Sequence, residues 1–149
     1  MGSFYHSQHE LIFVFKSGKG SHRNNIQLGK YGRNRTNVWS YPGANTRSRV
    51  GEEGNVLAMH PTVKPIALIA DALLDCSTRG DIVLDSFLSA GSTLLAAERV
   101  GRICYSVEIE GRYIDLTIRR WQQQTGERAI HTVTGRAFDD MAIMEMRHE

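Results

Sequence analysis

Long apolar runs are missing from this sequence of 149 residues. No run approaches the ~18 residues that a membrane-spanning helix needs, and the first residues lack the basic and then apolar pattern of a secretory signal. The two cysteines, Cys76 and Cys104, have neither the spacing of metal ligands nor that of a redox pair. The sequence therefore predicts a cytoplasmic protein with reduced thiols, no membrane partner and no metal site.

Acidic residues are missing from the stretch between Leu11 and Val50, although the net charge of the whole chain is only +2. Its basic residues are Lys16, Lys19, Arg23, Lys30, Arg33, Arg35, Arg47 and Arg49. A segment with one sign of charge suits a polyanion such as DNA, and all of these except Lys16 are candidate nucleic-acid contacts. A solvated loop that merely keeps the protein soluble is the other reading, and charge alone does not separate the two.

Regular alternation of strand and helix is predicted only after residue 60. The expected elements are a helix from Pro65, a strand at 82–85, a helix at 92–100, a strand at 103–108, a helix at 112–123 and a strand at 128–134. This order predicts an α/β fold with a mostly parallel sheet, right-handed crossovers and flanking helices. A buried strand is also expected at 10–16, and the tail after 138 is compatible with a short helix.

The chain reads as one domain with four zones. Residues 1–20 contain the early apolar strand, and residues 21–59 form a basic loop region with little periodicity and many Asn, Arg and Gly residues. Residues 60–135 carry the strand and helix alternation, and residues 136–149 form a charged, methionine-rich tail.

Two acids follow successive predicted strands, and they mark the candidate binding site. Asp85 ends the strand at 82–85, and Glu108 ends the next strand, 23 positions further on. In parallel α/β sheets, ligands bind at the carboxyl ends of strands, and an acid at about this spacing meets a ribose in nucleotide-binding units. The small residues between Asp85 and Thr93 would let a ligand approach the backbone. Helix-capping carboxylates are the alternative reading for both acids.

Two common nucleotide sites lack their glycine patterns here. The loop after Asp85 has no G-x-G-x-x-G, because Gly91 is its only glycine, and no Gly-Lys-Ser/Thr follows a strand. An oxidoreductase that uses a dinucleotide is therefore disfavoured. A nucleoside-like cofactor without a pyrophosphate fits these residues better.

The segment His60-Pro61-Thr62-Val63-Lys64-Pro65 resembles the H-P-T-x-K-P signature of DNA adenine-N6 and cytosine-N4 methyltransferases. As in that family, it precedes an amphipathic helix, the stretch ending at Asp85, and the strand of Glu108. Residues 9–16 and 35–39 are also similar to segments of these enzymes, so the resemblance covers roughly residues 4–135.

The resemblance implies the S-adenosylmethionine methyltransferase version of a Rossmann-like sheet, here in part, with DNA as the partner. It implies that Asp85 and Phe87 line the methionine and adenosine side, that Glu108 holds the ribose, and that Thr62 and Lys64 face the cofactor's carboxylate. The family's loop motif also includes Gly91 and Thr93, so both are candidate cofactor contacts. For Lys64, a solvated lysine at a helix start is the alternative reading, and His60 is expected to be structural.

The chain departs from the family pattern inside the cofactor loop. The family usually has D-P-F-x-G-S-G-T-T, whereas this chain has Ser86 for the proline, Ser89 for the first glycine and Ala90 for the serine. A Cβ at a glycine position with positive φ costs around 1 kcal/mol or more. Ser89 and Ala90 therefore put cofactor binding in doubt.

The second departure concerns the chemistry itself. The family holds a flipped base with an Asp/Ser/Asn-Pro-Pro-Tyr motif, but the only prolines here are Pro42, Pro61 and Pro65. No catalytic residue can therefore be assigned, and we expect a methyltransferase fragment that is inactive alone or needs a chain carrying the missing motif. The alternative is a non-catalytic nucleic-acid-binding protein. A sheet that lacks its neighbouring strands would expose an apolar edge, so self-association is also expected.

Overall fold

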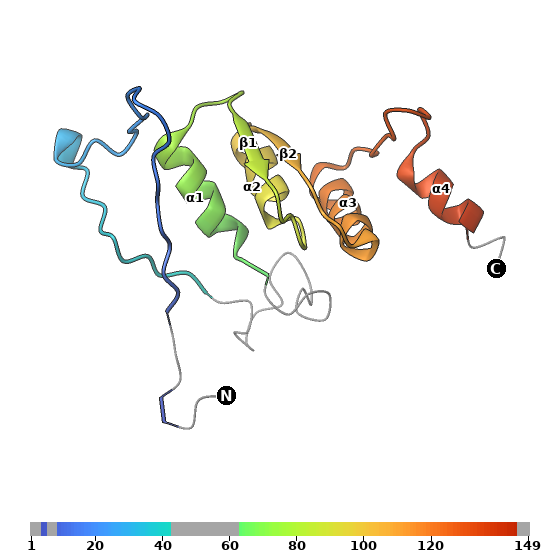
Figure 1. The fold of residues 1–149 in the computed structure, drawn as a ribbon, viewed down its shortest axis with the longest axis horizontal. Coiled ribbons are helices and arrows are strands. Elements are labelled where there is room, and N and C mark those ends of the chain that lie inside the picture. Colours follow the sequence, from blue (N-terminus) through green and yellow to red (C-terminus); the bar gives the residue numbers. More distant parts are fainter. Residues whose placement is uncertain (1–3, 6–8, 43–62, 146–149) are drawn as a thin grey trace.

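The computed structural model describes residues 4–5, 9–42 and 63–145, with side chains up to residue 141. Its centre is formed by α1 (Ile66–Cys76), β1 (Ile82–Asp85), α2 (Ser92–Val100), β2 (Ile103–Ser106) and α3 (Gly111–Thr125) (Figure 1). A short 3-10 turn, η1 (Lys30–Gly32), precedes them, and α4 (Phe138–Glu145) follows. The chain has the predicted α/β class, with a parallel pair of strands and flanking helices.

The two strands pair in parallel from Ile82 opposite Ile103 to Asp85 opposite Ser106. Their carboxyl ends therefore lie at the same edge. The loop after each strand begins at that edge, which is where the sequence places both candidate acids.

Helix α2 is the centre of the packing, because it contacts α1, β2 and α3. Leu95 and Ala96 of α2 are almost completely buried and pack against Ile66 and Ala70 of α1. Small side chains at this contact let the two helices approach closely, while Trp121 of α3 covers the side of the cluster. Gly101 ends α2 with a φ of 72°, a conformation that glycine adopts without strain.

The strand pair is covered on one face only within the described residues. Val83 and Cys104 are partly buried, whereas Ile82 and Leu84 on β1 are 67% and 71% exposed. Ile103 and Tyr105 on β2 are exposed in the same alternation. These four side chains form an open apolar sheet face.

The strand predicted at 10–16 is wrong. Residues 11–15 have neither helix nor strand structure, and Leu11, Phe13 and Phe15 are 73–87% exposed. A strand needs a neighbour for its backbone groups, and β1 and β2 pair only with each other among the described residues. Apolar content alone therefore misled the prediction.

The strand predicted at 128–134 is also wrong. Ile130 forms one isolated antiparallel bridge with Ala137, and the amide of His131 donates to the carbonyl of Arg136 at 2.8 Å. The segment thus turns back on itself instead of adding a third strand to the sheet. The helix at 92–100 has the predicted bounds, whereas the start of α1 and both ends of α3 move by one or two residues, with Pro65 just before α1.

The loop at 21–42 is without regular structure apart from η1, as predicted, but it is tied to α1. The Asn25 side chain donates to the carbonyls of Leu74 and Ser77 at 2.8 Å each, and its backbone amide donates to Asp75. These bonds satisfy carbonyls that the end of a helix leaves without partners.

A second attachment holds the loop further along. The guanidinium of Arg35 lies 2.9 Å from the Asp75 carboxylate and 4.4 Å from the centre of the Trp39 ring. The Tyr41 hydroxyl donates to the carboxylate of Asp71. Burial, followed by this hydrogen bond, raises the pKa of Tyr41, and burial raises the pKa of Asp75 against the opposing effect of Arg35.

Among the described residues, none of the helices has both the length and the apolar character that a membrane span needs.

Candidate functional site

The loop between β1 and α2 is attached to β2 by backbone and side-chain bonds. The amide of Val107 donates to the carbonyl of Asp85 at 2.9 Å, and the amide of Leu88 donates to the carbonyl of Val107 at 3.1 Å. The amide of Ser89 then donates to Oε2 of Glu108 at 2.7 Å. The two strand ends and the loop therefore form one connected unit.

Both candidate carboxylates help to shape this unit. Oδ1 of Asp85 accepts a bond from the amide of Phe87, and Oε1 of Glu108 accepts one from the amide of Glu110, each at 2.9 Å. Both acids are half-buried. Each carboxylate oxygen has a second lone pair, so a ligand hydroxyl could still donate to these acids.

Helix α3 packs against the loop between β1 and α2. Thr117 is almost completely buried, and its hydroxyl donates to the carbonyl of Ser89 at 3.2 Å. The buried guanidinium of Arg120 donates to the carbonyl of Ala90. A Cβ on Gly91 would lie 2.6 Å from Cγ2 of Thr117, and Gly91 has a φ of 82°. Glycine is therefore required at this position by both the contact and the backbone.

Lys64 lies beside the same unit. Its carbonyl accepts a bond from the hydroxyl of Ser92 in the first turn of α2, at 2.9 Å. Its ammonium lies 2.7 and 2.8 Å from the two carboxylate oxygens of Glu10. Both of these side chains remain substantially exposed, so the ion pair is accessible to solvent. Glu10 was not expected here from the sequence.

Large apolar side chains are left uncovered at the strand ends. Phe87 is 87% exposed and Ile109 is 100% exposed. The sequence analysis identified Phe87 but missed Ile109, as it missed Arg120. An apolar residue directly after the strand-end acid is the signal that could have indicated Ile109.

Ser89 has a φ of 54°, in the left-handed region. The sequence analysis identified this position as one where a side chain would be strained if φ were positive. The described structure thus contains the strain that a glycine would avoid.

Comparison with known proteins supplies the family. A family model described as DNA methylase, of the N6/N4 methyltransferase type, matches residues 2–119. The chain belongs to this family. Type II methyltransferase M.ScaI of Streptomyces caespitosus is 30% identical to this chain over 99 residues, which is 66% of this chain and 32% of M.ScaI.

Two other relatives are also matched over only part of their own length. The chain is 32% identical to type II methyltransferase M.BglII of Bacillus subtilis, over 68% of this chain and 26% of the relative. M2.MboI of Moraxella bovis is 27% identical over 82% and 44% of the two chains. The chain therefore spans from a quarter to under half of the length of these relatives.

A solved structure is also similar. A DNA modification methylase of Thermus thermophilus, solved in complex with S-adenosyl-L-methionine, is 34% identical to this chain. The match covers 50% of this chain and 27% of that one, with a TM-score of 0.40.

Of the residues predicted to contact a cofactor, the structure brings five together around the loop, and a sixth lies close by. Asp85, Phe87, Gly91 and Thr93 lie along the loop and the start of α2, Glu108 is bonded to the loop, and Lys64 contacts Ser92. Gly91 is buried against α3, and Thr93 is half-buried. Thr62 lies outside the described residues.

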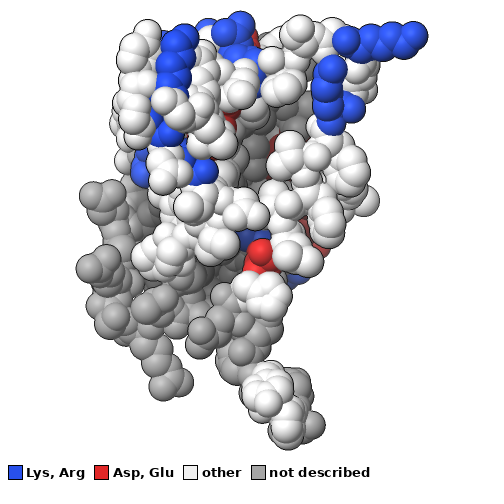
Figure 2. Space-filling view, turned by 90° about the vertical axis from the view of Figure 1, so that its left-hand side faces the viewer, with Lys and Arg blue, Asp and Glu red and all other residues white. Residues whose placement is uncertain are grey.

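The predicted nucleic-acid contacts fall into three groups. Lys19, Arg23, Lys30 and Arg33 are exposed, and Lys and Arg side chains gather in the upper part of the face in Figure 2. Arg35 differs from them, because its guanidinium pairs with Asp75. Arg47 and Arg49 lie outside the described residues.

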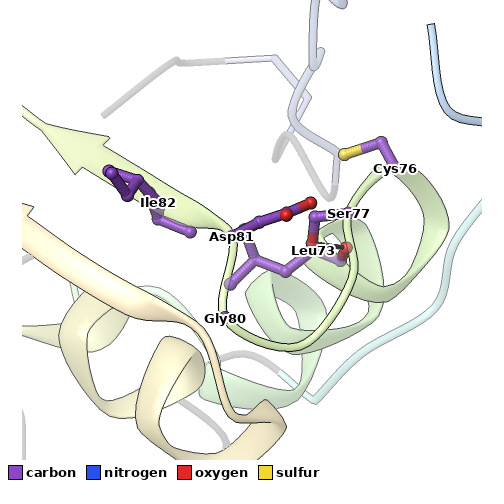
Figure 3. Close-up of a pocket in the computed structure, with 7 residues that line it drawn as sticks. Leu73, Cys76, Ser77, Gly80, Asp81 and Ile82 are labelled. Carbon is purple, nitrogen blue, oxygen red and sulfur yellow. Dashed lines mark hydrogen bonds between the residues drawn. The ribbon is translucent and has the colours of Figure 1, made fainter.

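An open hollow lies at the opposite end of β1 from Asp85. It is formed between the end of α1 and the start of β1, beside Cys76, Ser77 and Asp81 (Figure 3). The Asp81 carboxylate accepts a bond from the amide of Thr78 at 2.8 Å, and this bond lowers the pKa of Asp81. The Asp81 carboxylate therefore stabilises the turn before β1. The unit at the carboxyl ends of the strands is the better candidate for the functional site.

The strain at Ser89 generates a prediction about stability. Ser89→Gly should raise the free energy of unfolding by about 1 kcal/mol, because relief of the left-handed conformation outweighs the extra entropy of an unfolded glycine. Thermal unfolding should show a midpoint about 2–4 °C higher. Ser86→Gly is the matched control, because Ser86 lacks a positive φ, and it should lower the midpoint. A lower midpoint for Ser89→Gly would contradict the account of strain.

Proposed function

We propose that the chain is the cofactor-binding part of an S-adenosylmethionine-dependent DNA methyltransferase that acts on an exocyclic amine of adenine or cytosine. The observation that supports this most is the unit at the strand ends. Asp85 is the last residue of β1, and Glu108 follows β2, its parallel partner. The Glu108 carboxylate accepts a bond from the Ser89 amide, in the loop between β1 and α2, at 2.7 Å. Ligands of open parallel α/β sheets bind at this end of the strands.

The side chains around the unit fit the parts of the cofactor. Glu108 would accept hydrogen bonds from the ribose hydroxyls, and Phe87 and Ile109 offer exposed apolar surfaces for the adenine. The ammonium of Lys64 would pair with the cofactor's carboxylate, and Asp85, Gly91 and Thr93 would line the approach to α2. When bound, S-adenosylmethionine supplies a methyl group on a positively charged sulfur.

We infer that these 149 residues do not turn over alone, because the Pro-Pro-Tyr motif that holds a flipped base is absent from them. A separate chain that carries the motif would then restore methyl transfer. DNA would contact the exposed cations Lys19, Arg23, Lys30 and Arg33 through its phosphates.

We also infer that the chain associates with a second copy of itself. The open apolar sheet face of Ile82, Leu84, Ile103 and Tyr105 supports this, since these side chains are 49–71% exposed. Burial of such a face against its own copy would remove apolar area from water.

The cofactor assignment is tested by Glu108→Gln. This variant keeps the size of the side chain but loses the negative charge. Because an amide has one acceptor oxygen in place of two, it also loses one of the bonds to the amides of Ser89 and Glu110, and affinity for S-adenosylmethionine should fall about tenfold. Calorimetric titration measures the affinity, and thermal unfolding checks the fold. Glu110→Gln, two residues further along the chain, should leave affinity unchanged.

The same titration separates the two functions. If the unmutated chain binds no S-adenosylmethionine at millimolar concentration but binds DNA, the methyltransferase assignment fails. A non-catalytic nucleic-acid-binding protein then becomes the better description.

The contact between Lys64 and Glu10 generates a second prediction. Glu10 competes with the carboxylate of the ligand for the Lys64 ammonium, so Glu10→Gln should raise affinity for S-adenosylmethionine about two- to fivefold, the range of an exposed ion pair. Affinity for methylthioadenosine, which lacks the carboxylate, should not change. Glu127→Gln makes the same change in net charge at an exposed site and serves as the control. Equal gains for both ligands would show that Glu10 does not compete.

Self-association is tested by sedimentation at tens of micromolar. The unmutated chain should sediment as a species larger than a monomer, and Leu84→Lys should shift it towards monomer because a charge cannot be buried in the apolar face. Lys substitution of the exposed Leu28, which lies outside the face, should have no effect. A monomeric unmutated chain would rule the inference out.

A further inference from the structure

The turn at residues 24–33 is internally bonded. Oδ1 of Asn24 accepts bonds from the amides of Ile26 and Gln27 at 3.1 Å each. The amide of Gly29 donates to the carbonyl of Arg33 at 2.9 Å, which closes the turn. A loop with this many internal bonds has a defined conformation rather than an average one.

The turn is also fixed to the body of the protein. Asn25 bonds to three carbonyls at the end of α1, at 2.8–3.0 Å, and the guanidinium of Arg33 reaches back to the carbonyl of Asn25. Whatever the turn presents outward is therefore held in place before any ligand binds.

The side chain at the tip of this turn is Tyr31, in a strained conformation. Its φ is 55°, and its side chain is 83% exposed. A left-handed residue other than glycine is strained and persists where the surrounding structure imposes it. Core packing cannot explain an aromatic residue placed outside at such a cost.

Two cations flank the ring. The ammonium of Lys30 lies 5.5 Å from its centre, and the guanidinium carbon of Arg33 lies 5.8 Å from it. The turn lies within the stretch without acids. It also lies on the side of the molecule that Figure 2 shows, where Lys and Arg side chains gather. An exposed aromatic face between two flexible cations matches both parts of a nucleotide, the base and the phosphate.

We propose that Tyr31 stacks on an unpaired nucleobase while Lys30 and Arg33 neutralise the adjacent phosphates. The magnitudes favour this exchange. An exposed contact between a cation and a ring is weaker than the stacking of a base on an aromatic side chain. The base displaces the cations from the ring, and they gain phosphate partners instead. This inference rests on the proposed DNA function and adds a stacking residue that charge does not predict.

The test uses the full chain and oligonucleotides that carry 2-aminopurine, either single-stranded, as an unpaired base in a duplex, or fully paired. Anisotropy gives affinity, and 2-aminopurine fluorescence reports stacking. Tyr31→Ala should lower affinity about tenfold or more for the unpaired probes, lose the stacking signal and leave the salt dependence unchanged. Tyr31→Phe should retain both. Lys30→Gln should instead reduce the slope of log affinity against log salt by about one.

Two controls keep the outcomes distinct. Tyr31→Gly relieves the positive φ as it removes the ring, so it should fold at least as well as the unmutated chain and still bind weakly. Tyr5→Ala removes an equally exposed tyrosine outside the turn, 82% against 83% exposed, and should change nothing.

The inference is overturned if Tyr31→Ala binds the unpaired probes as tightly as the unmutated chain. In that case DNA binding stands, and only the stacking role is lost. If the unmutated chain binds none of the probes, the DNA function itself fails, and the stacking role fails with it.

Discussion

The close approach of α3 to the loop after β1 is the constraint on which the candidate site depends. Gly91 has no room for a Cβ beside Thr117, and Thr117 and Arg120 together bind the two carbonyls just before it. The Ser89 amide also donates one short hydrogen bond to Glu108. The loop is thus held both by α3 and by Glu108. The parallel pairing of β1 and β2 brings the two acids to one edge, and the contact with α3 holds the loop beside them.

Much of this arrangement could be predicted from the sequence because it depends on local patterns. The helical period from Ile66 to Leu73, the short apolar runs of β1 and β2, and the acid after each run were sufficient to place α1, both strands and the candidate site. The motif at 60–65, with the loop at 85–93, was sufficient to predict the family. Each of these signals spans only a few residues, so no knowledge of distant contacts was needed.

What could not be predicted depends on partners distant in the sequence. Residues 11–15 have the composition of a strand, yet no neighbour pairs with them among the described residues. Residues 129–138 pair with themselves, because a turn after His131 competes with the sheet. Glu10 reaches Lys64 across 54 positions, and Arg35 reaches α1 across 40. Charge patterning described Arg35 as one of several equivalent cations, whereas the fold gives it carboxylate partners.

Helix α1 connects two parts of the molecule that were described separately. Its first turn follows Lys64, and its last carbonyls are bound by Asn25 below the turn that carries Tyr31. Eleven residues of helix form a rod about 16 Å long. Because a helix of this length is stiff, a displacement of one end of α1 along its axis would also displace the other end. Any coupling that arises through α1 would be reciprocal, and each ligand would alter the affinity for the other by the same factor.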